Sequence, residues 1–196
     1  MLRHGETEWS RSGRHTGRSD IPLTSAGRAA ASSMASHLSA HSIAFVACSP
    51  LQRARETAAL AGLTPDVFTD DLLEWDYGAF EGRTTAQIRQ EEDDPTWVIW
   101  DAHIPPGRTP GEQPADVARR CRRVLQMCGP YLEQGQDVAL VAHGHVLRIL
   151  TSTWLDLDAR AGRLFALETG TVSYLGFERD QHVIELWNAP GMHETR

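Results

Sequence analysis

Apolar residues recur along this chain in two alternating patterns, short continuous runs and longer stretches at helical spacing. The short runs predict buried strands at residues 1–4, 43–48, 66–69 and 137–142. The longer stretches predict helices at residues 25–40, 50–60, 84–91, 115–134 and 144–154. Strands that alternate with helices indicate an open, mostly parallel α/β sheet, which binds its ligands at the carboxyl ends of the strands.

Individual residues predict where several of these elements begin or end. Ser49 is the expected N-cap of the helix after the second strand, with Pro50 at its first helical position. A further short helical stretch is expected to begin at Pro95. Because proline cannot donate a backbone hydrogen bond, Gly129-Pro130 is expected to kink the long helix or end it early.

The remaining segments divide into a hairpin and two irregular loops. Apolar runs at 172–177 and 182–187 flank four polar residues and predict the hairpin. Residues 102–113 hold three prolines and two glycines, which predicts an irregular surface loop. The loop at 10–23 is rich in glycine, serine and arginine, and it is too long for a simple connector. We therefore expect it to bind a ligand.

The composition describes an ordinary globular protein, and we expect a single domain over residues 1–196. The chain is 41% hydrophobic and 23% charged, with a formal net charge of −7. This charge argues against a nucleic-acid or membrane partner, although local arginines could hold a small anionic ligand. No apolar run approaches the roughly 20 residues that cross a bilayer. Three cysteines without CxxC spacing are expected in the core of a cytoplasmic protein.

Candidate chemical groups lie at the ends of the predicted strands or just after them. They are Arg3-His4-Gly5, Arg53, Glu74 and His143-Gly144. Because the carboxyl ends of parallel strands meet at one edge of a sheet, we expect these four segments to converge. An Arg-His-Gly tripeptide alone is a weak signal, but its combination with the other three segments is specific.

With these residues the chain resembles the histidine phosphatase superfamily, whose members include cofactor-dependent phosphoglycerate mutases and many phosphomonoesterases. The resemblance covers nearly the whole chain. Within the superfamily, the chain resembles bacterial broad-specificity acid phosphatases. It implies a three-layer α/β fold with helices on both faces of the central sheet. It also implies more apolar residues before Arg3 than this chain has. Either the natural start lies upstream or the central strand is short.

Within this resemblance, His4 is the expected nucleophile. A neutral imidazole can attack phosphorus and hold the phosphoryl group as a covalent intermediate. Its other ring nitrogen should donate to a backbone carbonyl, and neighbouring cations should keep the ring neutral. The phosphoryl oxygens then need fixed donors, for which we expect Arg3, Arg53 and His143. Amide groups at the N-terminus of the helix after Ser49 should add to them.

The leaving alkoxide needs a proton, and Glu74 is the candidate general acid. A neighbouring phosphate dianion favours the protonated form of its carboxyl group. Asp76 lies only two residues away and is the rival candidate. By position relative to Tyr77-Gly78, the resemblance favours Glu74. The same carboxylate could then deprotonate the water that hydrolyses phosphohistidine.

Substrate contacts are expected mainly from the first loop. Ser10 stands where many relatives carry an asparagine that touches phosphate, and Thr16-Gly17 matches the family's substrate loop. Gly144 is expected to add a contact beside His143. The roles of three neighbouring residues stay open between binding a second anionic group and pointing into solvent; they are Arg14, His15 and Arg18.

Other residues near these motifs are expected at the periphery of the site. His145 stands where mutases tend to carry asparagine, and we expect it at the rim. Three tryptophans could form an apolar wall beside the substrate or belong to the packed core; they are Trp75, Trp97 and Trp100.

The compact chain favours a phosphatase over a mutase. A mutase must keep a diphosphorylated cofactor and its phosphoenzyme away from water, which favours a longer enclosing lid. We therefore expect a phosphomonoesterase of small phosphorylated metabolites, best at acidic pH and without a metal or other cofactor. Phosphoglycerate mutase is the alternative within enzymes.

Two other classes of function remain open at this stage. A metal site could be built from His4, His143 and His145, although no HExxH or two-carboxylate motif accompanies them. A catalytically inactive module could instead keep the pocket in order to recognise a phosphorylated ligand. The relatives are often dimers, and a homodimer is expected by that analogy alone.

Overall fold

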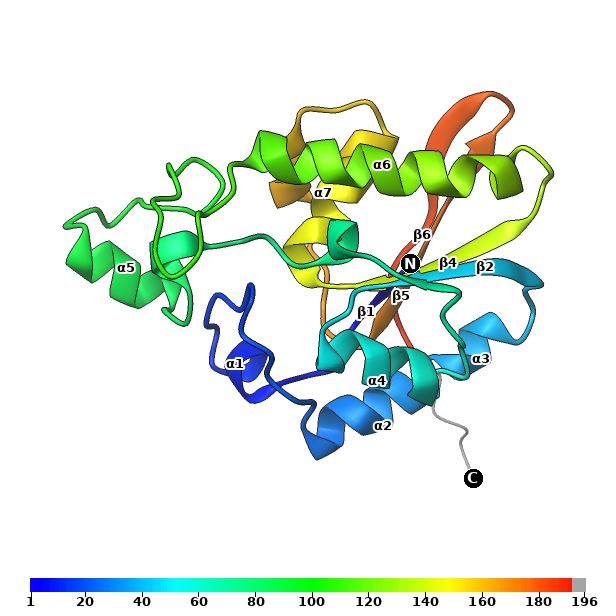
Figure 1. Cartoon of the computed structure of the whole chain (residues 1–196), viewed down its shortest axis with the longest axis horizontal. Helices are drawn as coiled ribbons and strands as arrows, with labels where there is room; N and C mark the ends of the chain where they lie inside the picture. The colour runs from blue at the N-terminus through cyan, green and yellow to red at the C-terminus, as the bar shows by residue number, and fades with distance from the viewer. Residues whose placement is uncertain (192–196) are drawn as a thin grey trace.

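The computed structural model describes residues 1–191, and its centre is a six-stranded mixed sheet (Figure 1). The strand order is β3-β2-β4-β1-β5-β6. β3, β2, β4 and β1 are parallel, whereas β5 and β6 form an antiparallel hairpin. In chain order the strands are Leu2–Arg3, Ile43–Cys48, Val67–Phe68, Asp137–Ala142, Thr171–Glu178 and Gln181–Pro190.

Helices cover both faces of this sheet, so the predicted three-layer α/β fold is confirmed. α6 and α7 lie on one face and α2, α3 and α4 on the other (Figure 1). The α-helices α1 to α7 are Glu8–Arg11, Ser25–Ser33, Ala35–Leu38, Gln52–Leu60, Thr85–Glu91, Pro114–Leu132 and Gly144–Trp154. Short 3₁₀ helices form at Asp70–Leu72, Gly78–Phe80 and Ala159–Leu164.

Two apolar cores follow from the alternation of side chains along the buried strands. Leu140 and Ala142 of β4 belong to the core that α6 and α7 cover. Val141, between them, belongs to the core under α2 and α4. Each face of the sheet is therefore closed by its own helices, and the strand ends are held in one fixed row.

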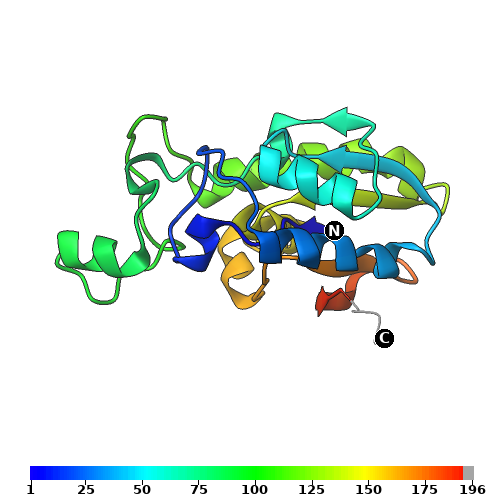
Figure 2. The same cartoon turned by 90° about the horizontal axis from the view of Figure 1, so that it is seen from below.

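The segments that are not part of this layered body gather beyond one end of the sheet. Figures 1 and 2 both place α1 and α5 there, together with the loop that connects α5 to α6. The parallel strands end at Arg3, Cys48, Phe68 and Ala142. Among residues 1–191, no helix is both long and apolar enough to cross a membrane.

Two predictions near the first helices are wrong. The helix expected over 25–40 is interrupted at Met34, whose N–H donates to the carbonyl of Ala31 instead of one residue further back. Ser49 is not a helix N-cap, because α4 begins only at Gln52 and has no side-chain cap. The Ser49 hydroxyl lies 2.7 Å from Nε2 of His143 instead.

Two more predictions fail where proline was the signal. Residues 95–101 form turns and no helix: the N–H of Trp97 donates to Asp94 and that of Asp101 to Val98, three residues back, and the carbonyl of Trp97 accepts from Nε of Arg89. The early end predicted at Pro130 is wrong, because α6 continues through Pro130 to Leu132. The first strand is shorter than predicted, at two residues.

Candidate active site

The ends of three parallel strands bring His4, Ser49 and His143 together. The N–H of His4 donates to the carbonyl of Ala142 over 3.0 Å, and that of Ser49 donates to Val141 over 3.0 Å. The rings of His4 and His143 lie edge to face, with their centroids 5.1 Å apart. The predicted convergence of these segments follows directly from the strand register.

His4 is held in one tautomer. Its Nδ1 lies 2.7 Å from the carbonyl oxygen of Gly5, which can only accept, so Nδ1 carries the proton and Nε2 keeps a lone pair. Burial lowers the pKa of His4 well below 6.5, and the charges of Arg53 and Arg3 lower it further. The ring is therefore neutral. The loop behind it is fixed because the N–H of Gly5 donates to Oγ1 of Thr57 over 3.1 Å.

His143 is also held as one neutral tautomer, here by Arg53. Nε of Arg53 donates to Nδ1 of His143 over 3.0 Å, so the ring proton must be on Nε2. That Nε2–H donates to the Ser49 hydroxyl over 2.7 Å. Burial, together with the charge of Arg53, lowers the pKa of His143 well below its usual value. His143 thus presents a neutral N–H donor beside His4.

Arg3 is a partly buried cation with an unused donor. Its Nη1 donates to the carbonyl of Leu167, while among residues 1–191 its buried Nε has no hydrogen-bond partner. The guanidinium group packs against Gly144, where an added Cβ would lie 3.1 Å from Cζ of Arg3. An unpartnered, buried cationic donor fits an anionic phosphoryl group.

Glu74 is bound at the N-terminus of α7. Its Oε1 accepts from the N–H groups of Trp75 and Val146, over 2.9 and 2.8 Å, and its Oε2 accepts from that of His145 over 3.0 Å. Three amide donors thus orient a side chain that is only 5% exposed. Oε1 has both lone pairs occupied, whereas Oε2 can still carry a proton.

Asp76, the rival acid, holds two loops together. Its Oδ1 accepts from the N–H of Gly78 over 2.9 Å and from the Thr109 hydroxyl, and its Oδ2 accepts from the N–H of Gly111 over 3.2 Å. Both oxygens therefore serve the fold of the segment between β3 and α6.

The predicted substrate loop is held against the site by Arg53 and Glu81. The two Nη atoms of Arg53 donate to the carbonyls of Thr16, Gly17 and Ser19 at 2.8–3.2 Å. Glu81 accepts from the N–H groups of Gly17 and Ser19 at 2.9–3.0 Å. Gly17 is needed here, because an added Cβ would lie 2.6 Å from the carbonyl oxygen of Trp75.

The hydroxyl groups of Ser10 and Thr16 are engaged locally. Ser10 Oγ accepts from the N–H of Thr7 and donates to its carbonyl within the cap of α1. The Thr16 hydroxyl donates to the carbonyl of Arg14 over 3.0 Å. Their contact with phosphate stays a prediction.

The two arginines left open in this loop have different surroundings. Arg14 is exposed, with its guanidinium 5.7 Å from the ring centroid of Trp9. Nη2 of Arg18 lies 3.4 Å from Oε2 of Glu112, so Arg18 forms a partly buried ion pair.

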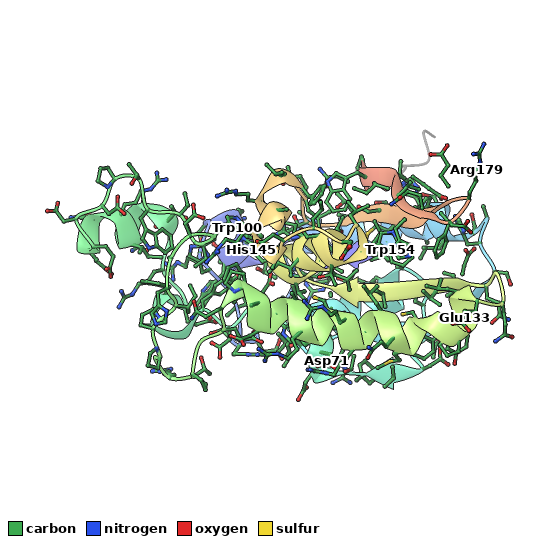
Figure 3. The ribbon with its side chains drawn as sticks, turned by 90° about the horizontal axis from the view of Figure 1, so that it is seen from above. Asp71, Trp100, Glu133, His145, Trp154 and Arg179 are labelled. Carbon is green, nitrogen blue, oxygen red and sulfur yellow. The ribbon has the colours of Figure 1, made fainter. Side chains whose placement is uncertain are left out.

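His145 is partly exposed and packs among aromatic rings, and its place at the rim stays a prediction. Figure 3 shows it beside Trp100, and the two ring centroids are 5.0 Å apart. The Tyr77 hydroxyl donates to Nδ1 of His145 over 2.6 Å, since burial raises the pKa of Tyr77 and lowers that of His145. His15 is also buried, and desolvation lowers its pKa to about 4. The solvent-exposed alternative for His15 is therefore wrong.

The three tryptophans belong to the packed core. Trp75, Trp97 and Trp100 are all buried in the core that α6 and α7 cover. Trp75 packs edge to face on Trp100, with centroids 5.5 Å apart. The core interpretation is confirmed, and these rings support the site from behind.

Sequence reasoning missed several residues whose hydrogen bonds hold the catalytic segments in place. They are Ser49 as a partner of His143, Thr57, Glu81, Glu112 and Arg120. Only Arg120 carried a usable signal. It lies three residues after Val117 and four before Val124, on the apolar stripe of a helix where a charged side chain is unexpected.

The side chains of the alternative metal site have other partners. Both ring nitrogens of His143 and Nδ1 of His145 are hydrogen-bonded within the protein. Within residues 1–191, no three His, Cys, Asp or Glu side chains are grouped so that they could hold a metal ion. The three cysteines are buried and unpaired.

Comparisons with known proteins agree with this geometry. An acid phosphatase of Mycobacterium tuberculosis is 39% identical over 180 residues, which cover 91% of this chain and 85% of the relative. A probable phosphoglycerate mutase of Proteus mirabilis is 33% identical over 191 residues, covering 95% and 88%. A solved structure from Mycobacterium tuberculosis has a TM-score of 0.89 at 37% identity, covering 97% of this chain and 96% of its own.

The family comparison covers almost the whole chain. The profile of the histidine phosphatase superfamily (branch 1) matches residues 1–190. The phosphatase relatives confirm the prediction of a phosphoric monoester hydrolase, and the profile confirms the resemblance seen in the sequence. The chain belongs to the histidine phosphatase superfamily, branch 1.

Proposed function

We propose that the protein is an acid phosphatase that hydrolyses small phosphorylated metabolites through a phosphohistidine on His4. The observation that carries this proposal is the tautomer of His4. Nδ1–H is committed to the carbonyl of Gly5, so the neutral ring offers the Nε2 lone pair for attack. The similarity to an acid phosphatase supports the proposed acid phosphatase activity.

In the first step Nε2 of His4 forms a bond to phosphorus while the bond from phosphorus to the leaving oxygen breaks. The departing alkoxide takes a proton from Oε2 of Glu74, the carboxyl oxygen with free capacity. Asp76 is a poorer donor because its oxygens bind Gly78, Thr109 and Gly111. The products of this step are a free alcohol and phosphorylated His4.

In the second step water attacks phosphorus and the bond from phosphorus to Nε2 breaks. The Glu74 carboxylate takes the water proton, which restores its acid form and leaves inorganic phosphate and neutral His4. A carboxylic acid is protonated more often as the pH falls, and the lowered pKa of His4 keeps the nucleophile neutral at mildly acidic pH. Both effects favour an acidic optimum.

The surrounding donors stabilise charge on the phosphoryl oxygens during both steps. Arg3 supplies the unpartnered Nε–H, and His143 supplies Nε2–H after exchanging its bond to Ser49. Arg53 enforces the His143 tautomer and, through the carbonyls of the substrate loop, ties that loop to the phosphate site. The arrangement needs no metal to balance the charge.

Phosphate release from 4-nitrophenyl phosphate tests this proposal in the presence of a chelator. We expect wild-type activity to survive the chelator and His4→Ala to lower kcat/KM by about 10³-fold or more, since the covalent route is lost. His41→Ala, which changes an exposed histidine, is the matched control and should keep full activity. Loss of wild-type activity with the chelator, or full activity of His4→Ala, would contradict the proposal.

Phosphoglycerate mutase is kept as a second candidate because a probable mutase is 33% identical to this chain. Incubation with 3-phosphoglycerate and its bisphosphorylated cofactor separates the two activities. We expect free phosphate as the product. Accumulation of 2-phosphoglycerate without phosphate would favour the mutase.

A further inference from the structure

Arg120 is a buried cation that directs three of its five N–H groups to the backbone of residues 71–74 and the other two to the Glu112 carboxylate. Nη1 donates to the carbonyls of Asp71 and Leu73, over 2.8 and 2.6 Å. Nη2 donates to the carbonyl of Glu74 over 3.1 Å and to Glu112, and Nε completes the pair with Glu112 over 2.9 Å. A guanidinium group has five donors, and every one of them is used.

From this geometry we infer that Arg120 is a positioning residue that sets the place of the general acid; the inference rests on the proposed role of Glu74. The backbone of Glu74 is held by Arg120 from α6, and its carboxyl group is held by amides of α7. Among residues 1–191, Arg120 has no hydrogen bond to His4 or Arg3, so its direct contacts reach the reaction through the Glu74 segment. Its charge also contributes to the lowered pKa of His143, and Arg120→Lys keeps that charge.

Glu112 completes the arrangement by neutralising Arg120 and linking it to the next loop. Its Oε2 accepts from the N–H of Asp76 over 3.0 Å and also receives Arg18 of the substrate loop. Arg120 is 5% exposed, so its charge requires such a partner. Figure 3 places Asp71, whose carbonyl Arg120 also binds, directly beside α6.

Lysine cannot replace this residue, even though it keeps the charge. An ammonium group has three donors at one point, whereas the acceptors here surround a planar fork. Arg120→Lys therefore leaves at least one of the three carbonyls or Glu112 unpaired, and the Glu74 segment can shift. A shift of about 1 Å at a proton donor is enough to cost on the order of 10²-fold in rate.

Displacement of the general acid should slow alkyl and aryl phosphates to different extents, whereas a general loosening of the fold should slow both alike. An alkyl phosphate needs a proton on its leaving oxygen, whereas the 4-nitrophenolate of an aryl phosphate departs without one. kcat/KM reports the steps up to phosphorylation of His4 for both substrates. Because one enzyme preparation hydrolyses both, the ratio of the two kcat/KM values does not depend on how much of the protein is folded.

The test compares glycerol phosphate and 4-nitrophenyl phosphate in wild type, Arg120→Lys and Glu112→Gln. We expect both variants to lose about 10²-fold in kcat/KM for the alkyl substrate and less than about 10-fold for the aryl substrate. Glu74→Gln should show the same selective loss. Arg123→Lys is the matched control on the same helix, where the exposed arginine pairs with Asp71, and should change neither value.

The outcomes separate this inference from the proposed function. An equal loss for both substrates, or no loss, in Arg120→Lys and Glu112→Gln would overturn the positioning role while Glu74→Gln still shows the selective loss. A wild-type enzyme that hydrolyses neither substrate would overturn the proposed phosphatase itself. Should Arg120→Lys fail to fold, Glu112→Gln decides the question alone.

Discussion

At the scale of single residues, the chemistry depends on hydrogen bonds that leave one nitrogen or oxygen free. His4 uses Nδ1 on Gly5 and keeps Nε2, while His143 uses Nδ1 on Arg53 and keeps its proton on Nε2. Two neutral imidazoles thus become an acceptor and a donor for the same phosphoryl group. The environment of each ring makes this difference.

Thr57 offers a direct test of how tightly the His4 loop must be held. Its hydroxyl accepts from the N–H of Gly5 and donates to the carbonyl of Arg53. Thr57→Val keeps the shape but leaves the buried Gly5 N–H unpaired, at a cost of about 1–3 kcal/mol in the free energy of unfolding. We expect urea denaturation to show this loss and kcat for 4-nitrophenyl phosphate to fall about 10-fold, because the attacking ring shifts.

Thr151→Val is the control for that substitution. Thr151 is equally buried in a helix, but among residues 1–191 its hydroxyl forms a single hydrogen bond, which it donates to the carbonyl of Leu147 within α7. Removal of this hydroxyl leaves no N–H group without an acceptor, so the free energy of unfolding and kcat should change little. Equal effects of the two substitutions would contradict the special role of the bond between Thr57 and Gly5.

The residues that attack, donate and protonate could be predicted from sequence, whereas those that hold them could not. Arg3, His4 and His143 follow strands that the apolar pattern identifies. Thr57 and Glu81 act on backbone N–H groups more than 50 residues away in sequence. Nothing in the local pattern distinguishes them from surface residues, because their partners are common to every residue type.

At the scale of elements, the site is built on strand ends and on one helix N-terminus. Amides at the start of α4 were predicted to bind phosphate, but the Gln52 N–H donates to Asp20 over 2.9 Å. The first amides of α7 are instead occupied by Glu74. A carboxylate is favoured at a helix N-terminus, so these amides fix the position of the Glu74 carboxyl group.

Strands and long helices were predicted well because their apolar spacing reflects burial on a definite face. The range 43–48 matches β2, and 137–142 matches β4. Errors arose where a side chain competed with the backbone. The Ser49 hydroxyl is hydrogen-bonded to His143 and does not cap a helix, and the carbonyl of Trp97 accepts from the Arg89 side chain in a segment that forms turns. Such contacts depend on residues distant in sequence and leave no periodic signal.

At the scale of the whole molecule, burial of neutral histidines links stability to pH. Desolvation lowers the pKa of His4, His143 and His145 well below 6.5 and that of His15 to about 4. In the unfolded chain these groups regain a pKa near 6.5. Below that pH the unfolded state binds more protons than the folded state, so stability falls as the pH falls.

Urea denaturation at about pH 7.5 and about pH 5 should therefore give a lower free energy of unfolding at the acidic pH, with about 2 kcal/mol from His15 alone. As the pH falls, this loss of stability begins near pH 6.5 and reaches its full size below the folded pKa of about 4. His15→Asn should weaken the pH dependence between these two conditions. Equal or greater stability of the wild type at the acidic pH would contradict the neutral state of the buried histidines.

The central claim is that His4 carries the phosphoryl group during turnover. The most direct test stops the reaction rapidly without acid and then measures the mass of the intact protein by mass spectrometry. With 4-nitrophenyl phosphate as donor, we expect wild type to gain the mass of one phosphoryl group. That phosphoryl group should be stable to alkali, labile to acid and located on the peptide that contains His4. A phosphoryl group on another residue, or turnover with no phosphoenzyme in wild type and in a Glu74→Gln variant that slows its breakdown, would contradict the account.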